Sequence, residues 1–227
     1  MASPTNAGTY AVLATINDVN YSGTNNGTLK IEKADATVTL GSLTQTYTGS
    51  PLGASAVTDP VGLKVDFTYS VVDPTDAGTY SVTGTIDNVN YKGSATSNAF
   101  VIGKAALTAA AVNETKVYGE ANPAFTIGYT GFLGGDDASV LDTAPVPSTN
   151  ADAASGVGEY DISLAAGSDN NYTIATTDAK LTVTKKAITV TAESLSKVYG
   201  VAVPAIGITY GEFVNGDTLT DIDTAPT

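Results

Sequence analysis

Internal repetition is the feature of this sequence that most constrains its fold, because repeated segments fold as equivalent units. The segment Pro4–Tyr10 recurs seventy positions later as Pro74–Tyr80, and Lys116–Gly119 recurs eighty-one positions later as Lys197–Gly200. All twelve tyrosines then fall into four classes of three, which are 10/80/160, 21/91/172, 47/118/199 and 69/129/210. Tyrosines at a fixed period are typical of framework residues that bury a ring and satisfy the hydroxyl locally.

Period-two alternation between turn residues predicts strands throughout the chain. The closing strand of each repeat shows it best, as Leu29-Ile31-Lys33, Phe100-Ile102-Lys104 and Leu181-Val183-Lys185. The Asn26-Gly27 pair predicts a hairpin turn just before the first of these strands. No segment shows a clear 3.6-residue apolar stripe, and the Ala-rich run 105–112 aligns with Ile188-Thr189-Val190-Thr191, which favours a strand there too.

The segment Asp76–Tyr80 resembles the tyrosine corner that precedes strand F in immunoglobulin-like sandwiches. Such a corner predicts that Tyr80 and Tyr160 are buried, with hydroxyls bonded to nearby backbone. Val82 stands where antibody domains carry a cysteine, so an apolar contact would replace the disulfide. We therefore expect an all-β chain of tandem small β-sandwich, immunoglobulin-like repeats arranged end to end. Another small β-rich module, such as a β-grasp-like repeat, is the alternative.

Measured from closing strand to closing strand, the sequence predicts four segments joined without flexible linkers. Residues 1–33 are the C-terminal part of a repeat, 34–104 and 105–186 are complete repeats, and 187–227 are the N-terminal part of a repeat. The two partial repeats are complementary, which predicts head-to-tail pairing between copies. Alternatively, a boundary at Pro74 would give three whole domains, about 4–73, 74–153 and 154–227, and a monomer.

Composition excludes several function classes. The chain has no cysteine, histidine or tryptophan, and all ten of its cations are lysines. The usual general bases, nucleophiles and soft metal ligands are therefore missing, so we expect no enzymatic activity, no catalytic residues and no cofactor. A net charge of −13 repels nucleic acid and anionic membranes, and no apolar run is long enough to span a bilayer.

Acidic clusters are the only candidate metal ligands, and calcium is the cation they suit. They comprise Asp136, Asp137 and Asp142, the partial copy Asp217, Asp221 and Asp223, and the run Asp169-Asn170-Asn171. None has the spacing of a known calcium loop, and Gly-Asp and Asp-Asn pairs are ordinary turn residues. Solvated turns are therefore the preferred interpretation, and no metal site is predicted.

Several motifs in register resemble the MBG-type tandem repeats of large bacterial surface proteins and adhesins. They are Lys116–Gly119, Asn122–Phe125, Tyr129–Phe132, Gly135-Asp136 and Leu181–Lys185. The resemblance covers nearly the whole chain from about residue 4. Residues 34–104 look like a shorter relative, with Gln45–Gly49 in place of the Lys-Val-Tyr-Gly motif. The resemblance implies an extracellular, cell-surface array that holds an adhesive or catalytic tip away from the cell, and it implies no catalytic residues.

The leading functional hypothesis is a structural spacer, a stalk or filament segment whose partners are neighbouring repeats of the same protein. Directly abutting repeats favour it and predict a maximum dimension well above that of a compact globule. A glycan- or host-protein-binding adhesion module is the alternative, although neither Trp nor Arg is available as an anchor. The least repeated stretches, Asp59–Gly62 and Pro145–Ser148, are where such a ligand would bind.

Overall fold

The computed structural model describes residues 3–224, and its regular structure is strand apart from two three-residue 3-10 turns, Ala138–Val140 and Leu219–Asp221. The predicted all-β class is thus confirmed. Residues 1–2 and 225–227, which the predicted first and last segments include, lie outside the described residues. The chain forms two compact bodies. The first runs to Ala105 and adds Phe132–Ser139 and Asn170–Thr173, while Ala106–Gly131, Val140–Asp169 and the chain from Ile174 onward form the second.

The first body contains ten complete strands. They are β1 (Gly8–Asn17), β2 (Ser22–Ile31), β3 (Ala34–Asp35), β4 (Thr37–Gly41), β5 (Thr44–Thr46), β6 (Ser55–Asp59), β7 (Val65–Tyr69), β8 (Gly78–Ile86), β9 (Tyr91–Lys92) and β10 (Ser94–Gly103). The central sheet has the order β5-β10-β8-β7, in which β5 and β10 are parallel. The pairs β4–β6 and β3–β9 complete the segment 34–104.

The core of this segment lies between the central sheet and β4. Val82 on β8 and Phe100 on β10 are fully buried, as the alternation of these strands predicted. The Leu40 side chain of β4 lies over Gly84 of β8, where a Cβ atom would come within 3.1 Å of it. Packing between the two sheets, with Val82 in place of a cysteine, agrees with the predicted sandwich.

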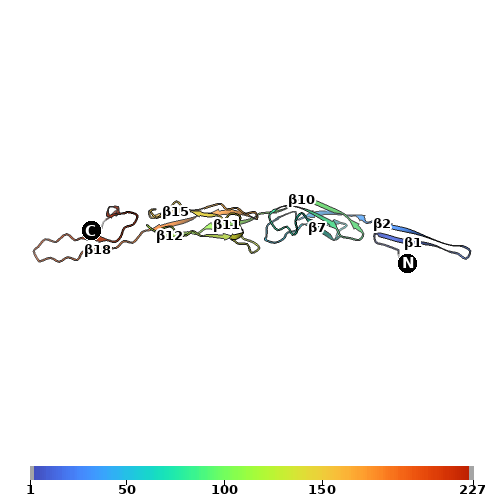
Figure 1. Ribbon diagram of the computed structural model, residues 1–227, viewed down its shortest axis with the longest axis horizontal. Helices are drawn as coiled ribbons and strands as arrows, with labels where there is room; N and C mark the ends of the chain where they lie inside the picture. The colour runs from blue at the N-terminus through green and yellow to red at the C-terminus, as the bar shows by residue number, and fades with distance from the viewer. Residues whose placement is uncertain (1–2, 225–227) are drawn as a thin grey trace. The chain divides into compact units, whose positions relative to one another are not determined.

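Strands β1 and β2 form a separate two-stranded hairpin, drawn in blue in Figure 1. Its register pairs Asn17 with Ser22, so the connection is Asp18–Tyr21 and Asn26-Gly27 lies within β2. The predicted turn at Asn26-Gly27 is therefore wrong. The Asp18 carboxylate accepts hydrogen bonds from the backbone N–H groups of Asn20 and Tyr21, at 2.8 and 3.1 Å, which fixes the turn there instead.

The second body holds the remaining strands, two of which it shares with the first. They are β11 (Ala105–Ala111), β12 (Glu114–Val117), β13 (Ile127–Thr130), β14 (Val146–Ser148), β15 (Gly158–Ala165), β16 (Tyr172–Thr177), β17 (Ala179–Thr184), β18 (Val190–Ala192) and β19 (Ile208–Tyr210). One sheet has the order β12-β17-β15-β14 and the other β13-β11-β16. The Ala-rich run is a strand, as expected from its repeat partner.

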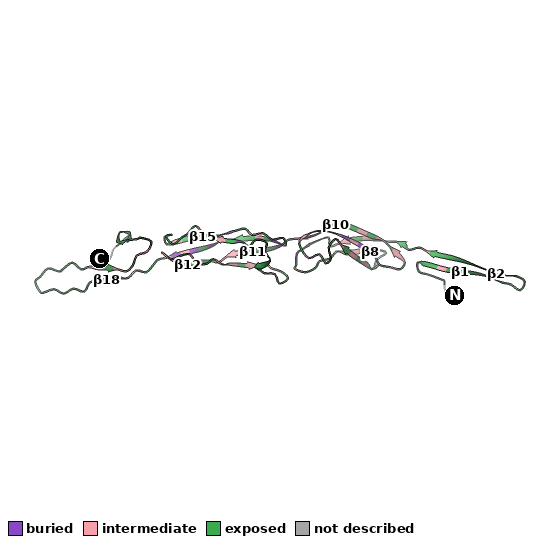
Figure 2. Cartoon of the chain, in the orientation of Figure 1, coloured by how far each residue is buried: buried purple, intermediate pink, exposed green. Residues whose placement is uncertain are grey.

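The core of the second body joins its two sheets. Ile162 of β15 and Leu181 of β17 have no exposed surface, and Ala111 of β11 packs against their cluster. Burial of such apolar surface is the main stabilising contribution in a chain without disulfides. Figure 2 shows the buried residues as purple segments of β15 and its neighbours.

Two parts of the chain leave apolar residues exposed. In the β1–β2 hairpin, Leu13 is 63% and Val19 is 96% exposed. The two-stranded sheet β18–β19 and its flanking loops expose Val198 and Tyr199, which is 101% exposed. Both parts are mostly green in Figure 2. Each is a two-stranded sheet, in contrast to the four-stranded sheets of residues 34–186.

Tyr80 and Tyr160 form the predicted hydrogen bonds to backbone, and Tyr10, at the same position of its repeat, forms one too. The hydroxyl of Tyr10 donates to the carbonyl of Asn6 at 2.8 Å, that of Tyr80 to Asp76 at 2.7 Å, and that of Tyr160 to Gly156 at 3.0 Å. The prediction that the Tyr80 and Tyr160 rings are buried is wrong in degree, since both are half-buried. The Tyr80 ring packs against Phe100, and the Tyr160 ring packs against the cluster of Ile162 and Leu181.

Candidate functional site

The contacts that join one repeat to the next are the most elaborate polar arrangement in the first body. They centre on the Asn-Tyr dipeptides Asn90-Tyr91 and Asn171-Tyr172, which occupy the same position in successive repeats. Before Asn90, the side-chain carbonyl of Asn88 accepts from the N–H groups of Asn90 and Tyr91 at 2.8 and 3.2 Å. This is the same turn that Asp18 makes in the hairpin. A side chain two positions upstream thus sets the direction of the asparagine.

The asparagine side chain clasps the corner loop of the preceding repeat. Asn171 Oδ1 accepts from the backbone N–H of Ala77 at 2.8 Å, and its Nδ2 donates to Asp76 Oδ1 at 3.0 Å. Asn90 repeats both bonds with Ala7 and Asn6, at 2.8 and 3.1 Å. A primary amide suits this position because it donates and accepts along one edge. We call this pair of bonds the asparagine clasp.

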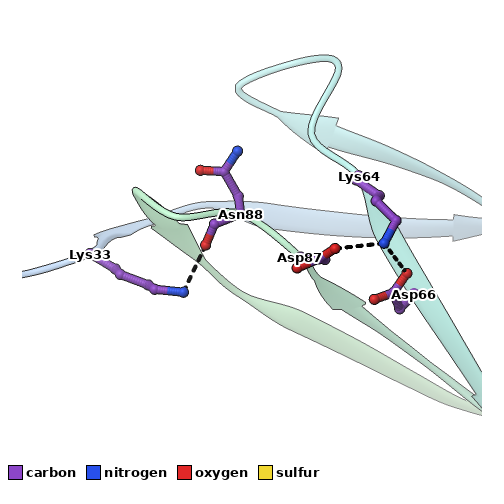
Figure 3. Close-up of polar contacts among 5 residues, drawn as sticks. All are labelled: Lys33, Lys64, Asp66, Asp87 and Asn88. Carbon is purple, nitrogen blue, oxygen red and sulfur yellow. Dashed lines mark hydrogen bonds and ion pairs between the residues drawn. The ribbon is translucent and has the colours of Figure 1, made fainter. Parts of the chain in front are cut away.

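Backbone hydrogen bonds reinforce the clasp at the point where one repeat passes into the next. The N–H of Ala34 donates to the carbonyl of Asn90 at 2.8 Å, and the N–H of Ala105 donates to that of Asn171 at 2.9 Å. At the first junction Lys33 Nζ also donates to the carbonyl of Asn88 at 2.7 Å (Figure 3). The closing-strand lysine therefore has a structural role in joining repeats.

A second lysine forms ion pairs with two carboxylates near the strand that leads into the first junction. Lys64 Nζ lies 2.5 Å from Asp87 Oδ2 and 3.0 Å from Asp66 Oδ1, as Figure 3 shows. The hydrogen bond from Lys64 holds the pKa of the Asp87 carboxyl below its usual value. All three side chains are more than half exposed, so solvent screens the pair and its contribution to stability is small.

The tyrosine of the dipeptide Asn171-Tyr172 occupies a buried site lined by aromatic rings, which we call the seat of Tyr172. Tyr172 is only 2% exposed, and its ring lies edge-on to those of Tyr47 and Phe132, each at a centroid distance of 5.4 Å. Its hydroxyl donates to Asp136 Oδ2 at 2.7 Å and accepts from the N–H of Leu133 at 2.9 Å. The seat is thus apolar along its walls and polar at its end.

Asp136 receives a second phenol at the same oxygen. The Tyr47 hydroxyl donates to Asp136 Oδ2 at 2.9 Å, so a tyrosine of one repeat and a tyrosine of the next share one carboxylate. Burial, and then the hydrogen bond to Asp136, raise the pKa of Tyr47 to about 12. The phenol therefore stays protonated and donates at any pH near neutrality.

Backbone packing at this junction is tight enough to exclude side chains. Gly49 and Gly134 face each other, and a Cβ atom built on Gly49 would lie 2.6 Å from the Cα of Gly134. Both glycines have positive φ, 75° and 64°, which disfavours any other residue independently of the space. Glycine at these two positions lets the loop of one repeat approach the backbone of its neighbour.

The acidic candidates for calcium do not gather into a cation site. Within residues 3–224, no group of three or more acidic side chains comes together in a way that could hold a metal. Asp136 serves the two tyrosines, Asp137 accepts from Ser139, and Asp221 accepts from the N–H of Thr218. Asp169 is buried, Asn171 forms the clasp, and Asn170, Asp142 and Asp223 are exposed. Asp217 lines a pocket of the second body together with Lys185 and Phe213.

The two least repeated stretches are not alike in structure. In Asp59–Gly62 the first residue ends β6 and the other three form the loop that follows, where Thr58 Oγ1 donates to the carbonyl of Pro60 at 2.8 Å and Val61 is 81% exposed. Within Pro145–Ser148, residues 146–148 form β14 and pair with β15. The second stretch is therefore part of a sheet rather than a free loop.

Sequence reasoning did not find the clasp or the tyrosine seat. Alignment of a repeat with itself shows which residues are equivalent, but not which residues of neighbouring repeats touch. The available signal was the Asn-Tyr dipeptide, which occurs three times after an Asp or Asn two positions upstream of its asparagine. A polar residue kept in register beside a framework tyrosine is typical of a contact between repeats.

Comparison with known families agrees with the motifs. A family model described as "MBG domain" matches residues 1–35 and 36–106, and one described as "MBG domain (YGX type)" matches residues 107–182 and 188–227. No curated protein matches the chain. No helix within residues 3–224 has the length and apolar character to cross a membrane. MBG domains are tandem repeats of large surface proteins. The chain belongs to the MBG-domain family and consists of such repeats in tandem.

Proposed function

We propose that this chain is a structural spacer, a stalk segment of a bacterial surface protein that acts outside the cell. The asparagine clasp is the observation that carries the proposal. The same two side-chain bonds, and the same backbone bond, recur at two successive junctions of the first body. A junction built from the same hydrogen bonds each time is what a spacer needs, whereas a flexible tether needs no such bonds.

The short connections support the same function. Only Lys104 separates β10 from β11, and two residues separate β2 from β3. Bending between repeats requires free backbone torsions, and these joins offer almost none. The natural partners of each repeat are therefore its neighbours, and assembly of copies head to tail through partial repeats extends the same geometry.

We propose no catalytic role, no cofactor and no nucleic-acid partner. The support is compositional, because a chain without histidine, cysteine and arginine and with a net charge of −13 lacks the usual groups for these tasks. An adhesive function would require a ligand site in addition to the junctions.

Small-angle X-ray scattering of the monomeric chain tests the spacer. A compact globule of this length would have a radius of gyration of about 17 Å. We expect a clearly larger value, unchanged across salt concentrations because the junctions rely on hydrogen bonds and buried rings. The double variant Asn90→Ala/Asn171→Ala should broaden the distribution of dimensions, while Asn170→Ala, an exposed neighbour, should not. A compact profile for the unmodified chain would count against the proposal.

A further inference from the structure

The edge of strand β15 is recessed where its pairing with β14 stops. Strand β14 pairs with β15 only along Val146–Ser148, which lie opposite Ser163–Ala165. A pocket of about 420 Å³ lies where the pairing would continue. Its walls are residues 148–150 and four residues of β15, namely Glu159, Tyr160, Asp161 and Ser163. We call this recess the β15 notch.

Two residues of β15 direct backbone groups into the notch. The N–H of Leu164 donates to Asp178 Oδ1 at 2.9 Å, and Asp178 directly precedes β17, so this N–H lies on the β17 side of β15. Backbone groups of successive residues in a strand point to opposite sides, so those of Glu159 and Asp161 lie on the β14 side. Among residues 3–224, no strand pairs with them there. The notch therefore offers two N–H and two C=O groups at the spacing of an antiparallel ladder.

The equivalent edge in the segment 34–104 is filled by that segment itself. Ser81 of β8 is the repeat counterpart of Asp161, since each follows the tyrosine of a Gly-x-Tyr corner. The Ser81 carbonyl accepts from the N–H of Ser70 at 3.0 Å, and its N–H donates to Ser70 Oγ at 3.2 Å. Strand β7 reaches this point because it pairs as far as Tyr69, opposite Val82. The β15 notch is thus the place that Ser70 occupies in the other repeat.

The charge beside the notch is negative. Glu159 and Asp161 are two residues apart on β15, so both side chains lie on the same face of the sheet, where both are exposed. Lys180 neutralises Asp161, with its Nζ 2.5 Å from Asp161 Oδ1. Within the described part of the chain, Glu159 forms no ion pair. Its carboxylate is therefore available to a cationic group entering the notch.

These groups select an extended peptide. Alternating N–H and C=O groups on a sheet edge match the backbone of an added strand, and side-chain contacts then give selectivity. A sugar ring would use the carboxylates and hydroxyls of the notch but would leave this alternation unmatched. We propose that the β15 notch binds a short extended segment of a partner protein, antiparallel to β15 as β14 is, with a lysine or arginine opposite Glu159. The site adds a peptide-binding role to the spacer and does not rest on the junctions.

Amide hydrogen exchange of the full chain, followed by NMR, tests whether the edge is open. The Asp161 N–H should exchange at least about tenfold faster than the Ser81 N–H, because Ser70 protects only the latter. Equal protection of the two amides in the chain alone would show that the notch is already filled, and would overturn the proposal.

Titration with a defined peptide tests binding. The probe is acetyl-Thr-Lys-Thr-Lys-Thr-amide, in which threonine favours the extended state and the lysines lie on one face. The peptide should shift the amide signals of Glu159 and Asp161 and slow their exchange, while the signal of Ser81 stays unchanged. The same peptide N-methylated at both lysines keeps its charge but loses the N–H groups of the ladder, so it should bind at least about tenfold more weakly.

Two charge variants at equivalent positions test the selectivity. Glu159→Lys should weaken binding of the probe about tenfold or more, because it replaces the carboxylate with a like charge. Thr79→Lys is the matched control, since Thr79 is the exposed counterpart of Glu159 in the other repeat, and it should bind as the unmodified chain does. Circular dichroism melting checks that both variants are folded.

Three results would overturn the proposal. One is the absence of shifts at Glu159 and Asp161 at peptide concentrations up to about 5 mM, where even weak binding is visible. Another is equal binding of the N-methylated peptide, which would show that charge alone holds the probe. The third is a response of these amides to neutral hexoses but not to the peptide, which would make the notch a sugar site. The scattering test of the spacer is unaffected by any of them.

Discussion

The side-chain carbonyl of Asn171 accepts a hydrogen bond of 2.8 Å from the backbone N–H of Ala77, ninety-four positions earlier in the chain. Asn171→Ala should destabilise the first body by about 1–2 kcal/mol, because a part-buried N–H loses its acceptor. Urea denaturation followed by circular dichroism measures the change. Asn170→Ala is the matched control, since Asn170 is exposed. Equal effects of the two substitutions would contradict the role given to the clasp.

Asp136 should contribute more to the free energy of unfolding than its neighbour Asp137. Asp136→Ala leaves the hydroxyls of Tyr47 and Tyr172 without their acceptor in a buried site, which should cost about 2–3 kcal/mol. Asp137 is on the surface and bonds only Ser139, so Asp137→Ala should cost well under half as much. Denaturant titration of both variants decides the order. If Asp137→Ala were the more damaging change, the shared carboxylate would not be the centre of the seat.

Stability should fall at high pH in a way that depends on Tyr47. Its pKa is about 12 when folded and about 10 in an unfolded chain, so the folded state holds the proton more tightly. The resulting stabilisation is fully present below pH of about 10 and is lost as pH rises toward 12. Urea midpoints measured across that range should decline less in Tyr47→Phe than in the unmodified chain. Parallel declines would show that Tyr47 ionises like an exposed phenol.

The hydrogen bond of a corner tyrosine can be tested by itself, because a change to phenylalanine removes the hydroxyl and keeps the ring. Tyr80→Phe removes the bond to the Asp76 carbonyl but leaves the ring, and because the site is half-exposed, water can replace part of the bond. We expect a cost of about 0.5–1 kcal/mol. Tyr199→Phe, at a fully exposed ring, should change the free energy of unfolding by no more than experimental error. A larger loss at position 199 would refute this account of the corner.

Lys116 and Lys197 form a natural pair for comparison, since they occupy the same position in successive repeats. Lys116 is 4% exposed, and its Nζ donates to the carbonyls of Asp152 and Glu120. Lys116→Met keeps most of the stem but leaves both carbonyls unpaired, so it should cost about 1–3 kcal/mol. Lys197, which is exposed and bonds only the Val201 carbonyl, should tolerate the same change. Thermal melting of both variants provides the comparison.

Local features of this structure followed readily from the sequence. The corner bonds span four residues, and the strands alternate with period two, so both leave a signal within one repeat. The hairpin turn was misplaced because Asn26-Gly27 is a strong turn pair in isolation, yet the side chain of Asp18 satisfies the backbone of a different turn. Here a specific hydrogen bond overrode a statistical preference.

The candidate site was harder to predict because its contacts lie between repeats. Asp136 was assigned to a solvated turn, with calcium as the less favoured alternative, since a carboxylate beside glycines suits either. Its actual partners, Tyr47 and Tyr172, are 89 and 36 positions away. Periodicity placed both tyrosines in framework classes but gave no reason to bring these two classes together. Only the fold of the loop 132–139 against the preceding repeat does that.

Parallel pairing of the last strand of a repeat with an earlier strand determines how the end of that repeat would respond to pulling. The last strand is β10 in one repeat and β17 in the other, and it pairs in parallel with β5 and β12 respectively. Tension on the chain beyond the last strand pulls that strand along its length past its partner, so their hydrogen bonds are strained together rather than broken one after another. A last strand held in this way resists extraction along its own axis better than a strand whose hydrogen bonds open singly from one end.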